Sequence, residues 1–213
     1  MDQNKEAEER IYEGETPGVS YGDIAERYYT VGQYMKEVKD VSKAMAAAGD
    51  SYICDEYLNA MGSPEAESVY VLHDLNNDGI EEFFIGLKFN YDIPYYVIYD
   101  VYTWKDGRAY QLMRGIGYRN GSCKICENGV IEDNYSGSAW DGQTLYHILP
   151  EGGTELETID SVSSRRDGTV QSYYHWNELI DENLVQTTKE QYQPESVTYI
   201  DCNMETIEQL RLS

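Results

Sequence analysis

The stretch VLHDLNNDGIEEFFIG, residues 71–86, places oxygen-bearing side chains at alternate positions directly before an apolar run. Ca²⁺ takes about six to eight oxygen ligands, and a tight loop supplies several of them from short carboxylate and amide side chains at its first, third and fifth positions. Gly79 is at the sixth position, where the chain must turn sharply. The spacing therefore predicts a calcium site formed by Asp74, Asn76, Asp78, the backbone carbonyl of Ile80, and Glu82 directly or through a water.

This loop differs from an EF-hand. The twelfth position of an EF-hand is a bidentate Glu, whereas here it is Ile85, and both flanks show the period of strands rather than helices. Asp, Asn and Gly also build ordinary turns, so a turn without metal is the competing interpretation. The set of four oxygen-bearing side chains with Gly79 between them favours the metal site. We expect a structural role for Ca²⁺, which would hold two strands together and neutralise part of an acidic chain.

Two helices are expected before the loop. Ser20 and Asp23 have the spacing of a capping box, and apolar residues then recur at helical spacing until Gly49 ends the first helix. Asp50 is placed to cap a second, shorter helix. The helical part is therefore expected over residues 20–62.

An antiparallel sheet is expected after the helices, because the apolar period changes to two. About eight or nine strands with turn signals between them are predicted over residues 69–176, including hairpins at Asp106-Gly107 and Asn128-Gly129. Residues 177–213 have mixed patterns and end in a short helix. The prediction is an α+β fold in one domain, residues 20–213, with N-terminal helices packed on a large curved antiparallel sheet.

The charge of the chain excludes several classes of partner. The sequence has 16 basic and 39 acidic residues, a formal net charge of −23. Such a charge repels phosphate backbones and anionic lipid headgroups, which argues against nucleic-acid and membrane-surface binding. The sequence contains no run of about 18 apolar residues, so no membrane-spanning segment is predicted. The polar leader, residues 1–19, lacks the basic and apolar regions of a signal peptide and is expected to be flexible.

The cysteines show no convincing redox or zinc pattern. Cys123 and Cys126 have the CxxC spacing, but both are expected on one strand, where residues three apart face opposite sides. Cys54 and Cys202 lack the spacing of ligand pairs. We interpret all four as structural, and the sequence leaves their oxidation state open.

The order of these parts resembles a group of uncharacterised exported lipoproteins and secreted proteins of gut Firmicutes. The matching stretches are YVLHDLNNDGIEEFFIG and YYVIYDVYTWKDGRAYQL, and TTKEQYQPESVTYI is similar to the usual ending of that group. The loop also resembles the calcium loops of FG-GAP and VCBS repeats. Glu81 departs from the Pro of the group, and Phe83 and Phe84 replace aliphatic residues. The resemblance implies calcium binding and export, but no catalytic activity.

The expected function is that of a non-catalytic extracellular or cell-surface module. It would be tethered through a lipid-modified N-terminus whose signal is absent from this sequence, and a cytoplasmic location is less favoured. The 21 Tyr residues and the three Trp residues, Trp104, Trp140 and Trp176, are candidates for binding a glycan or a protein. A hydrolase acting on an extracellular polymer is the alternative, with carboxylates that no motif identifies. We expect a monomer, and the sequence leaves the ligand open.

Overall fold

The structure is a computed structural model of the 213-residue chain. The residues that it describes are 14–15, 20–48, 53–114, 122–136, 140–148, 156–165, 170–175, 178–179, 198–200 and 203–212. Their contacts divide the chain into two compact units, the first of residues 1–74, 79–116 and 202–213 and the second of residues 75–78 and 117–201. The α+β class is confirmed, with N-terminal helices, antiparallel sheets and a short C-terminal helix. The single-domain boundary stays a prediction.

Helices open the first unit, and the first of them begins as predicted. α2 (Tyr21–Val38) starts with the capping box: the Asp23 backbone N–H donates to Ser20 Oγ at 3.1 Å, and the Ser20 backbone N–H donates to Asp23 Oδ2 at 2.9 Å. The two donors on Ser20, its backbone N–H and its hydroxyl, lower the pKa of the Asp23 carboxyl. The cap therefore fixes the position of the first turn of α2.

The long helix expected to end at Gly49 is instead two helices. Lys39 adopts a left-handed conformation, with φ 52° and ψ 39°, and ends α2. Asp40 Oδ1 then accepts a hydrogen bond from the Lys43 backbone N–H at 3.1 Å at the start of α3 (Val41–Ala48). The next helix, α4 (Asp55–Met61), is capped by Cys54, whose Sγ accepts from the Tyr57 backbone N–H at 3.4 Å. Asp50, the expected cap, lies outside the described residues.

The first unit contains an antiparallel sheet with the strand order β1-β5-β4-β3-β2-β12. Its strands are β1 (Gly14–Glu15), β2 (Ala66–His73), β3 (Glu82–Phe89), β4 (Tyr95–Lys105), β5 (Arg108–Met113) and β12 (Glu205–Thr206). β1 lies within the expected flexible leader, where Gly14 and Glu15 pair with Gln111 and Tyr110 of β5. The loop predicted to bind calcium, which begins at Asp74 and is called the calcium-type loop below, connects β2 and β3, as predicted.

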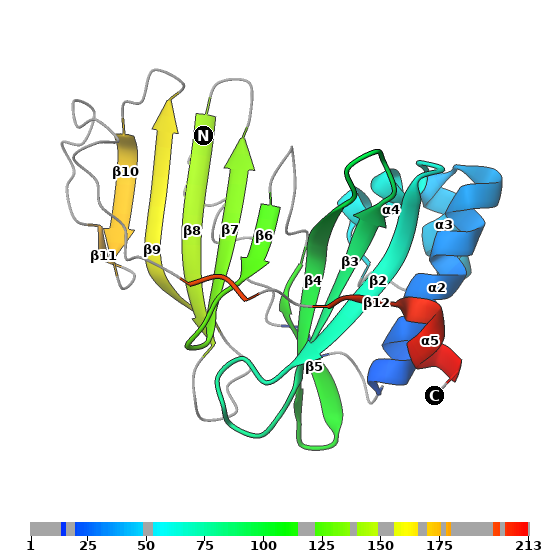
Figure 1. Ribbon diagram of the computed structural model, residues 1–213, viewed down its shortest axis with the longest axis horizontal. Helices are drawn as coiled ribbons and strands as arrows, with labels where there is room; N and C mark the ends of the chain where they lie inside the picture. The colour runs from blue at the N-terminus through cyan, green and yellow to red at the C-terminus, as the bar shows by residue number, and fades with distance from the viewer. Residues whose placement is uncertain are drawn as a thin grey trace. The chain divides into compact units, whose positions relative to one another are not determined.

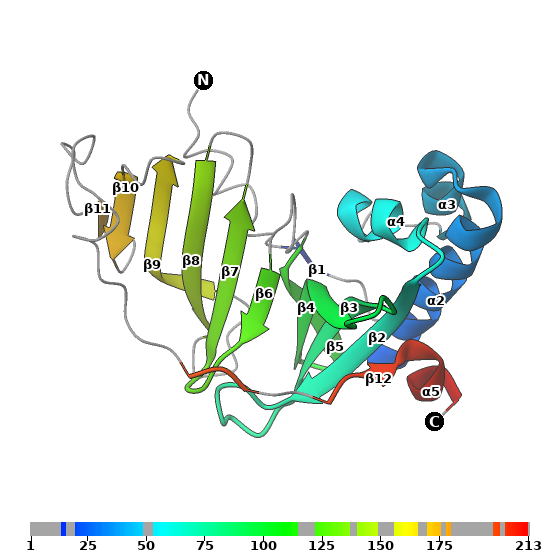
Figure 2. The same ribbon diagram turned by 45° about the horizontal axis from the view of Figure 1, so that its top comes forward.

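Helices α2, α3 and α4 and the closing helix α5 (Ile207–Leu212) lie on one side of this sheet (Figures 1 and 2). Large apolar side chains fill the space between these layers, among them Tyr57, Phe83, Ile85 and Leu87. The core also holds a buried polar group. The Tyr28 hydroxyl donates to Asp100 Oδ2 at 2.6 Å, and Gln111 Nε2 donates to Asp100 Oδ1 at 3.2 Å. Helix and sheet are thus joined by apolar packing and by the Asp100 carboxylate, which accepts hydrogen bonds from α2 and from β5.

The second unit contains a meander of consecutive strands, β6 (Ser122–Ile125), β7 (Val130–Ser136), β8 (Trp140–Ile148), β9 (Leu156–Arg165), β10 (Val170–His175) and β11 (Glu178–Leu179). Residues 198–200 extend the sheet at β6: Tyr199 forms a bridge with Cys126, and the Ile200 backbone N–H donates to the Ile125 carbonyl at 2.9 Å. The strands expected in one meander are therefore divided between two sheets.

Three of the four cysteines, Cys54, Cys123 and Cys126, are free and buried. Desolvation raises the pKa of the Cys54 and Cys123 thiols well above its ordinary value and raises the pKa of Cys126 to about 11. Cys202 lies outside the described residues. Within the described part of the chain, no helix is both long and apolar enough to cross a membrane.

Candidate functional site

The loop between β2 and β3 is folded by its own side chains. Asp74 Oδ2 accepts a hydrogen bond from the Gly79 backbone N–H at 3.0 Å. Asn76 Oδ1 accepts from the Asp78 backbone N–H at 3.2 Å, and Asn76 Nδ2 donates to Asp78 Oδ2 at 3.1 Å. Gly79 has a φ of 87°, which L residues rarely adopt, so the sixth position has the conformation that a calcium loop requires there. The short polar side chains therefore face the loop's own backbone.

Glu82 and Ile80 are placed differently from the other three predicted ligands. Glu82 is the first residue of β3 and is fully buried, and its Oε1 accepts a hydrogen bond from Thr103 Oγ1 at 3.1 Å. Ile80 is half-buried. Among the described residues, no three His, Cys, Asp and Glu side chains are grouped so as to hold a metal ion. The predicted set draws in addition on an amide and a backbone carbonyl, and this all-oxygen donor chemistry fits a hard cation such as Ca²⁺.

An open recess of about 480 Å³ lies beside the end of the loop. Gly79, Ile80 and Glu81 form part of its wall. The rest is formed by residues 20–22 at the start of α2, by Leu72 of β2 and by Trp104 of β4. The recess is mainly apolar. The loop predicted to bind calcium is therefore also a wall of a recess that contains a Trp ring.

Tyr21 connects the parts of this recess. Its hydroxyl donates to the Glu81 carbonyl at 2.8 Å, which fixes the loop exit to the start of α2. Its ring lies edge-on to Trp104, with centroids 5.6 Å apart and an interplanar angle of 72°, and 5.0 Å from the ring of Phe83. Edge-to-face pairs of this kind are favourable beyond the area they bury. Tyr21 was missed by the sequence reasoning, since the residue after an N-cap carries no signal of its contacts.

Trp104 is the one of the three Trp candidates whose side chain the structure describes, and it lines this recess. Trp176 and the side chain of Trp140 lie outside the part of the chain that the structure describes. Glu81 is the one carboxylate among the described residues lining the recess. The recess therefore presents aromatic faces, backbone groups and one exposed carboxylate to a ligand.

No protein-family model matches this chain, and neither the curated proteins nor the solved structures that were compared with it contain a match.

Proposed function

We propose that this protein is a non-catalytic extracellular or cell-surface module in which a structural Ca²⁺ in the loop stabilises a ligand-binding recess beside Trp104. One observation carries the proposal: Gly79, Ile80 and Glu81, at the end of the loop, line the same recess as Tyr21 and Trp104. An ion held by the loop would fix the wall that a ligand touches. Calcium binding and ligand binding would then be coupled through the backbone of these three residues.

The side chains of Asp74, Asn76 and Asp78, the Ile80 carbonyl and Glu82 would hold the ion. When bound, Ca²⁺ supplies positive charge that offsets part of the net charge of −23. Calcium loops of extracellular modules bind with a Kd of about 10⁻⁴ to 10⁻³ M.

A glycan or a protein side chain is the ligand class that fits an open, mainly apolar recess with a Trp and a Tyr. Aromatic rings give large contact area and a polar edge, which suits both ligands. The alternative, a hydrolase acting on an extracellular polymer, needs two carboxyl groups about 5–10 Å apart. Glu81 is the one carboxylate that the described lining supplies, so the recess favours binding over hydrolysis.

Thermal unfolding in excess EDTA and in about 5 mM CaCl₂ tests the calcium part of the proposal. A site occupied at about ten times its Kd stabilises the folded state by about 1.4 kcal/mol, which for a chain of this length raises Tm by roughly 3–6 °C. Asp78→Ala should abolish the rise. Asp92→Ala, which removes a carboxylate from another loop of the same sheet, should preserve it. An equal Tm in EDTA and calcium for the unmodified protein would show that the loop is a turn only.

Calorimetric titration with neutral oligosaccharides, compared between the unmodified protein and Trp104→Phe, tests the ligand part. Binding that is weakened by Trp104→Phe and by EDTA supports the coupled site. An affinity unchanged by both Trp104→Phe and EDTA would show that the ligand binds elsewhere on the protein.

A further inference from the structure

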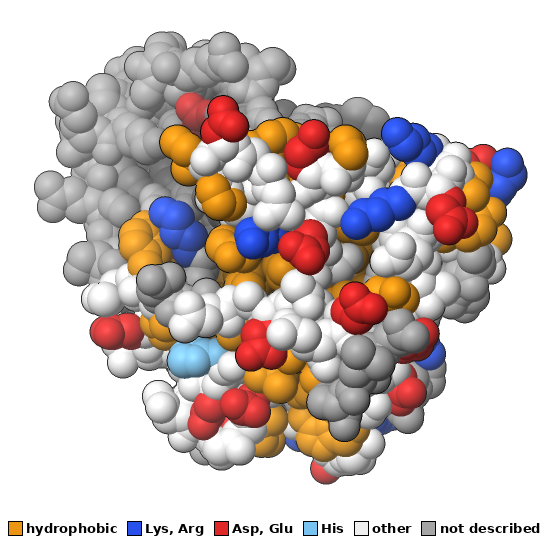
Figure 3. Space-filling view, turned by 45° about the vertical axis from the view of Figure 1, so that its right-hand side comes forward, with side chains coloured by type: hydrophobic (Ala, Val, Ile, Leu, Met, Phe, Trp, Pro, Cys, Tyr) orange, Lys and Arg blue, Asp and Glu red, His pale blue; other side chains and the backbone are white. Residues whose placement is uncertain are grey.

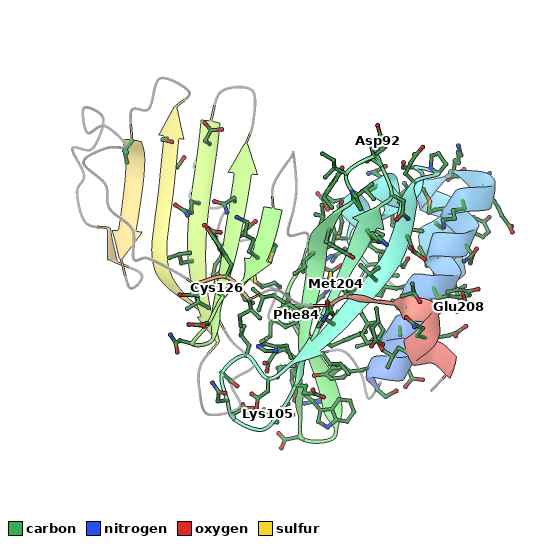
Figure 4. All side chains as sticks on the ribbon, in the orientation of Figure 1. Phe84, Asp92, Lys105, Cys126, Met204 and Glu208 are labelled. Atoms are coloured by element: carbon green, nitrogen blue, oxygen red, sulfur yellow. The ribbon has the colours of Figure 1, made fainter. Side chains whose placement is uncertain are left out.

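An exposed aromatic surface lies on the β3–β4 hairpin, at the end of β3 opposite the calcium-type loop. Tyr91, Tyr95 and Tyr96 are 49%, 48% and 46% exposed, and Ile93 is 83% exposed. Figure 4 shows Asp92 of this hairpin at one end of the sheet and Lys105 at the other. Single exposed apolar side chains are ordinary, but several on one short segment mark interaction sites. We call Tyr91, Asp92, Ile93, Tyr95 and Tyr96 the hairpin surface.

Two rings of this surface, those of Tyr91 and Tyr95, pack on a buried Phe. Phe89, only 7% exposed, stacks on Tyr95 with centroids 4.9 Å apart and an interplanar angle of 18°, and on Tyr91 with 6.2 Å and 1°. Tyr91 and Tyr95 are 6.0 Å apart at 18°. The backbone is fixed as well, since the Asn90 N–H donates to the Glu65 carbonyl at 3.0 Å. Rings ordered before binding lose little conformational entropy when a partner docks.

The charge around the hairpin surface is mainly negative. Asp92 is exposed between Tyr91 and Ile93, and the Glu67 carboxylate lies beside the hairpin, where its Oε2 accepts from Asn90 Nδ2 at 3.5 Å. Lys88, the cross-strand neighbour of Tyr96, is a cation at the same hairpin. Acidic side chains are spread over the face of the molecule in Figure 3, in keeping with the net charge of −23. This field attracts cations and repels anionic lipids, nucleic acids and a second copy of the chain.

Tyrosine faces hold cations elsewhere in this protein. The guanidinium carbon of Arg108 lies 4.8 Å from the centre of the Tyr110 ring, and Lys124 Nζ lies 4.1 Å from the centre of the Tyr199 ring. Such cation–π contacts contribute about 0.5–1 kcal/mol at exposed sites. The tyrosines of the hairpin surface offer the same chemistry to cations of another molecule.

We propose that the hairpin surface docks a basic segment of a partner polypeptide, with Arg or Lys side chains on the faces of Tyr91 and Tyr95. Asp92 pairs with a further cation, and Ile93 packs on the aliphatic part of the segment. A basic segment is favoured over a neutral glycan by the preordered rings, the acidic neighbours and the two internal cation–π pairs. A neutral glycan would gain no electrostatic attraction from the negative charge. The proposal goes beyond the proposed function and does not depend on calcium or on the recess.

The test measures binding of a fluorescein-labelled peptide of alternating Arg and Gly-Ser, and of the same peptide with citrulline replacing Arg. The protein should bind the Arg peptide and bind the citrulline peptide at least tenfold more weakly. The double variant Tyr91→Ala/Tyr95→Ala keeps the net charge unchanged, so loss of two cation–π contacts should weaken binding by about 5- to 30-fold. Tyr91→Phe/Tyr95→Phe should retain affinity because it keeps the ring faces. Tyr199→Ala, which removes an equally exposed Tyr from the other unit, is the matched control and should bind normally.

Three results would overturn the proposal. Unchanged affinity in the Ala double variant, with its Tm and circular dichroism spectrum preserved, would mean that the net charge alone attracts the peptide. Binding of a neutral hexasaccharide that the double variant loses would identify a glycan surface. Concentration-dependent dimerisation that the double variant abolishes in sedimentation would identify a contact between copies. If the Ala variant unfolds, Asp92→Asn is the variant that tests the proposal. It should weaken binding of the Arg peptide several-fold and reduce the salt dependence of that binding.

Discussion

Gly86 of β3 is the position where one added methyl group should damage the first sheet most. The pairing of β3 with β4 shifts register between Ile85 and Gly86, and the two backbones approach closely at Gly86. A Cβ on Gly86 would overlap the Val97 carbonyl oxygen and lie 3.1 Å from the Val97 carbonyl carbon and 3.2 Å from Ile98 Cα. All three atoms belong to the backbone of β4 and cannot rotate away. Gly86→Ala therefore forces the two strands apart.

The size of the effect follows from two opposing terms. Overpacking a core costs about 1–3 kcal/mol, and contact with backbone places this site at the upper end. Alanine also reduces the conformational entropy of the unfolded chain relative to glycine, which stabilises the folded state by about 0.4–1 kcal/mol. The free energy of unfolding should therefore fall by about 2–2.6 kcal/mol and Tm by roughly 4–10 °C. Urea unfolding followed by circular dichroism measures the first quantity, and calorimetry measures the second.

Gly32→Ala is the matched control. The same methyl group on α2 would lie 2.9 Å from Met61 Cε and 3.3 Å from Ser68 Oγ, which are ends of side chains that can move. Alanine also favours the helix by about 1 kcal/mol over glycine. Gly32→Ala should stay within about 1 kcal/mol of the unmodified protein. Equal losses in the two variants, or a loss below about 1 kcal/mol for Gly86→Ala, would refute the reasoning.

Three further predictions concern buried and capping groups. Tyr28→Phe removes the 2.6 Å hydrogen bond to the buried Asp100 carboxylate and should lower the urea-derived stability by about 1.5–3 kcal/mol; a loss under about 0.5 kcal/mol would contradict this role. Ser20→Ala should cost about 1 kcal/mol of stability. Because the cap lowers the pKa of Asp23, its contribution is present above the ordinary pKa of Asp, about 3.9, and is lost as pH falls through the lowered value, so acid unfolding curves of the two proteins should converge. The three buried thiols have raised pKa values, so Ellman's reagent should react with at most one of the four cysteines of the native protein; prompt reaction of more would show exposed thiols.

Local features of the fold were predictable because neighbouring residues determine them. Asp106 and Gly107 have φ values of 51° and 79°, and Asn128 and Gly129 have 59° and 77°, the left-handed pairs that two-residue hairpins require. The break at Lys39 was not predictable, because Lys has no intrinsic preference for the left-handed conformation that it adopts. Turn signals also identify neighbouring strands without showing where one ladder of hydrogen bonds stops and the next begins.

In the candidate site, too, some features could be predicted from the sequence and others could not. The residues of the loop follow from their spacing, and the Gly79 conformation is the one expected at the sixth position. The recess depends on Tyr21 meeting Trp104 and the Glu81 carbonyl across the sheet, and no periodicity in the sequence relates these residues. Glu82 was expected to coordinate the ion directly or through a water; as the first residue of β3 it is buried, and its carboxylate accepts a hydrogen bond from Thr103.

The last segment of the chain provides an edge partner for both sheets. Residues 198–200 pair with the end of β6, and Glu205 and Thr206 pair with Tyr70 and Val69 of β2. During synthesis the β6 edge therefore remains unpaired until residues 198–200 have left the ribosome, and the β2 edge until residues 205 and 206 have done so. Unpaired strand edges are templates for association with other chains. Exposure of these two edges thus lasts until residues 198–206 emerge, and a chain stalled before residue 198 would display both open edges at once.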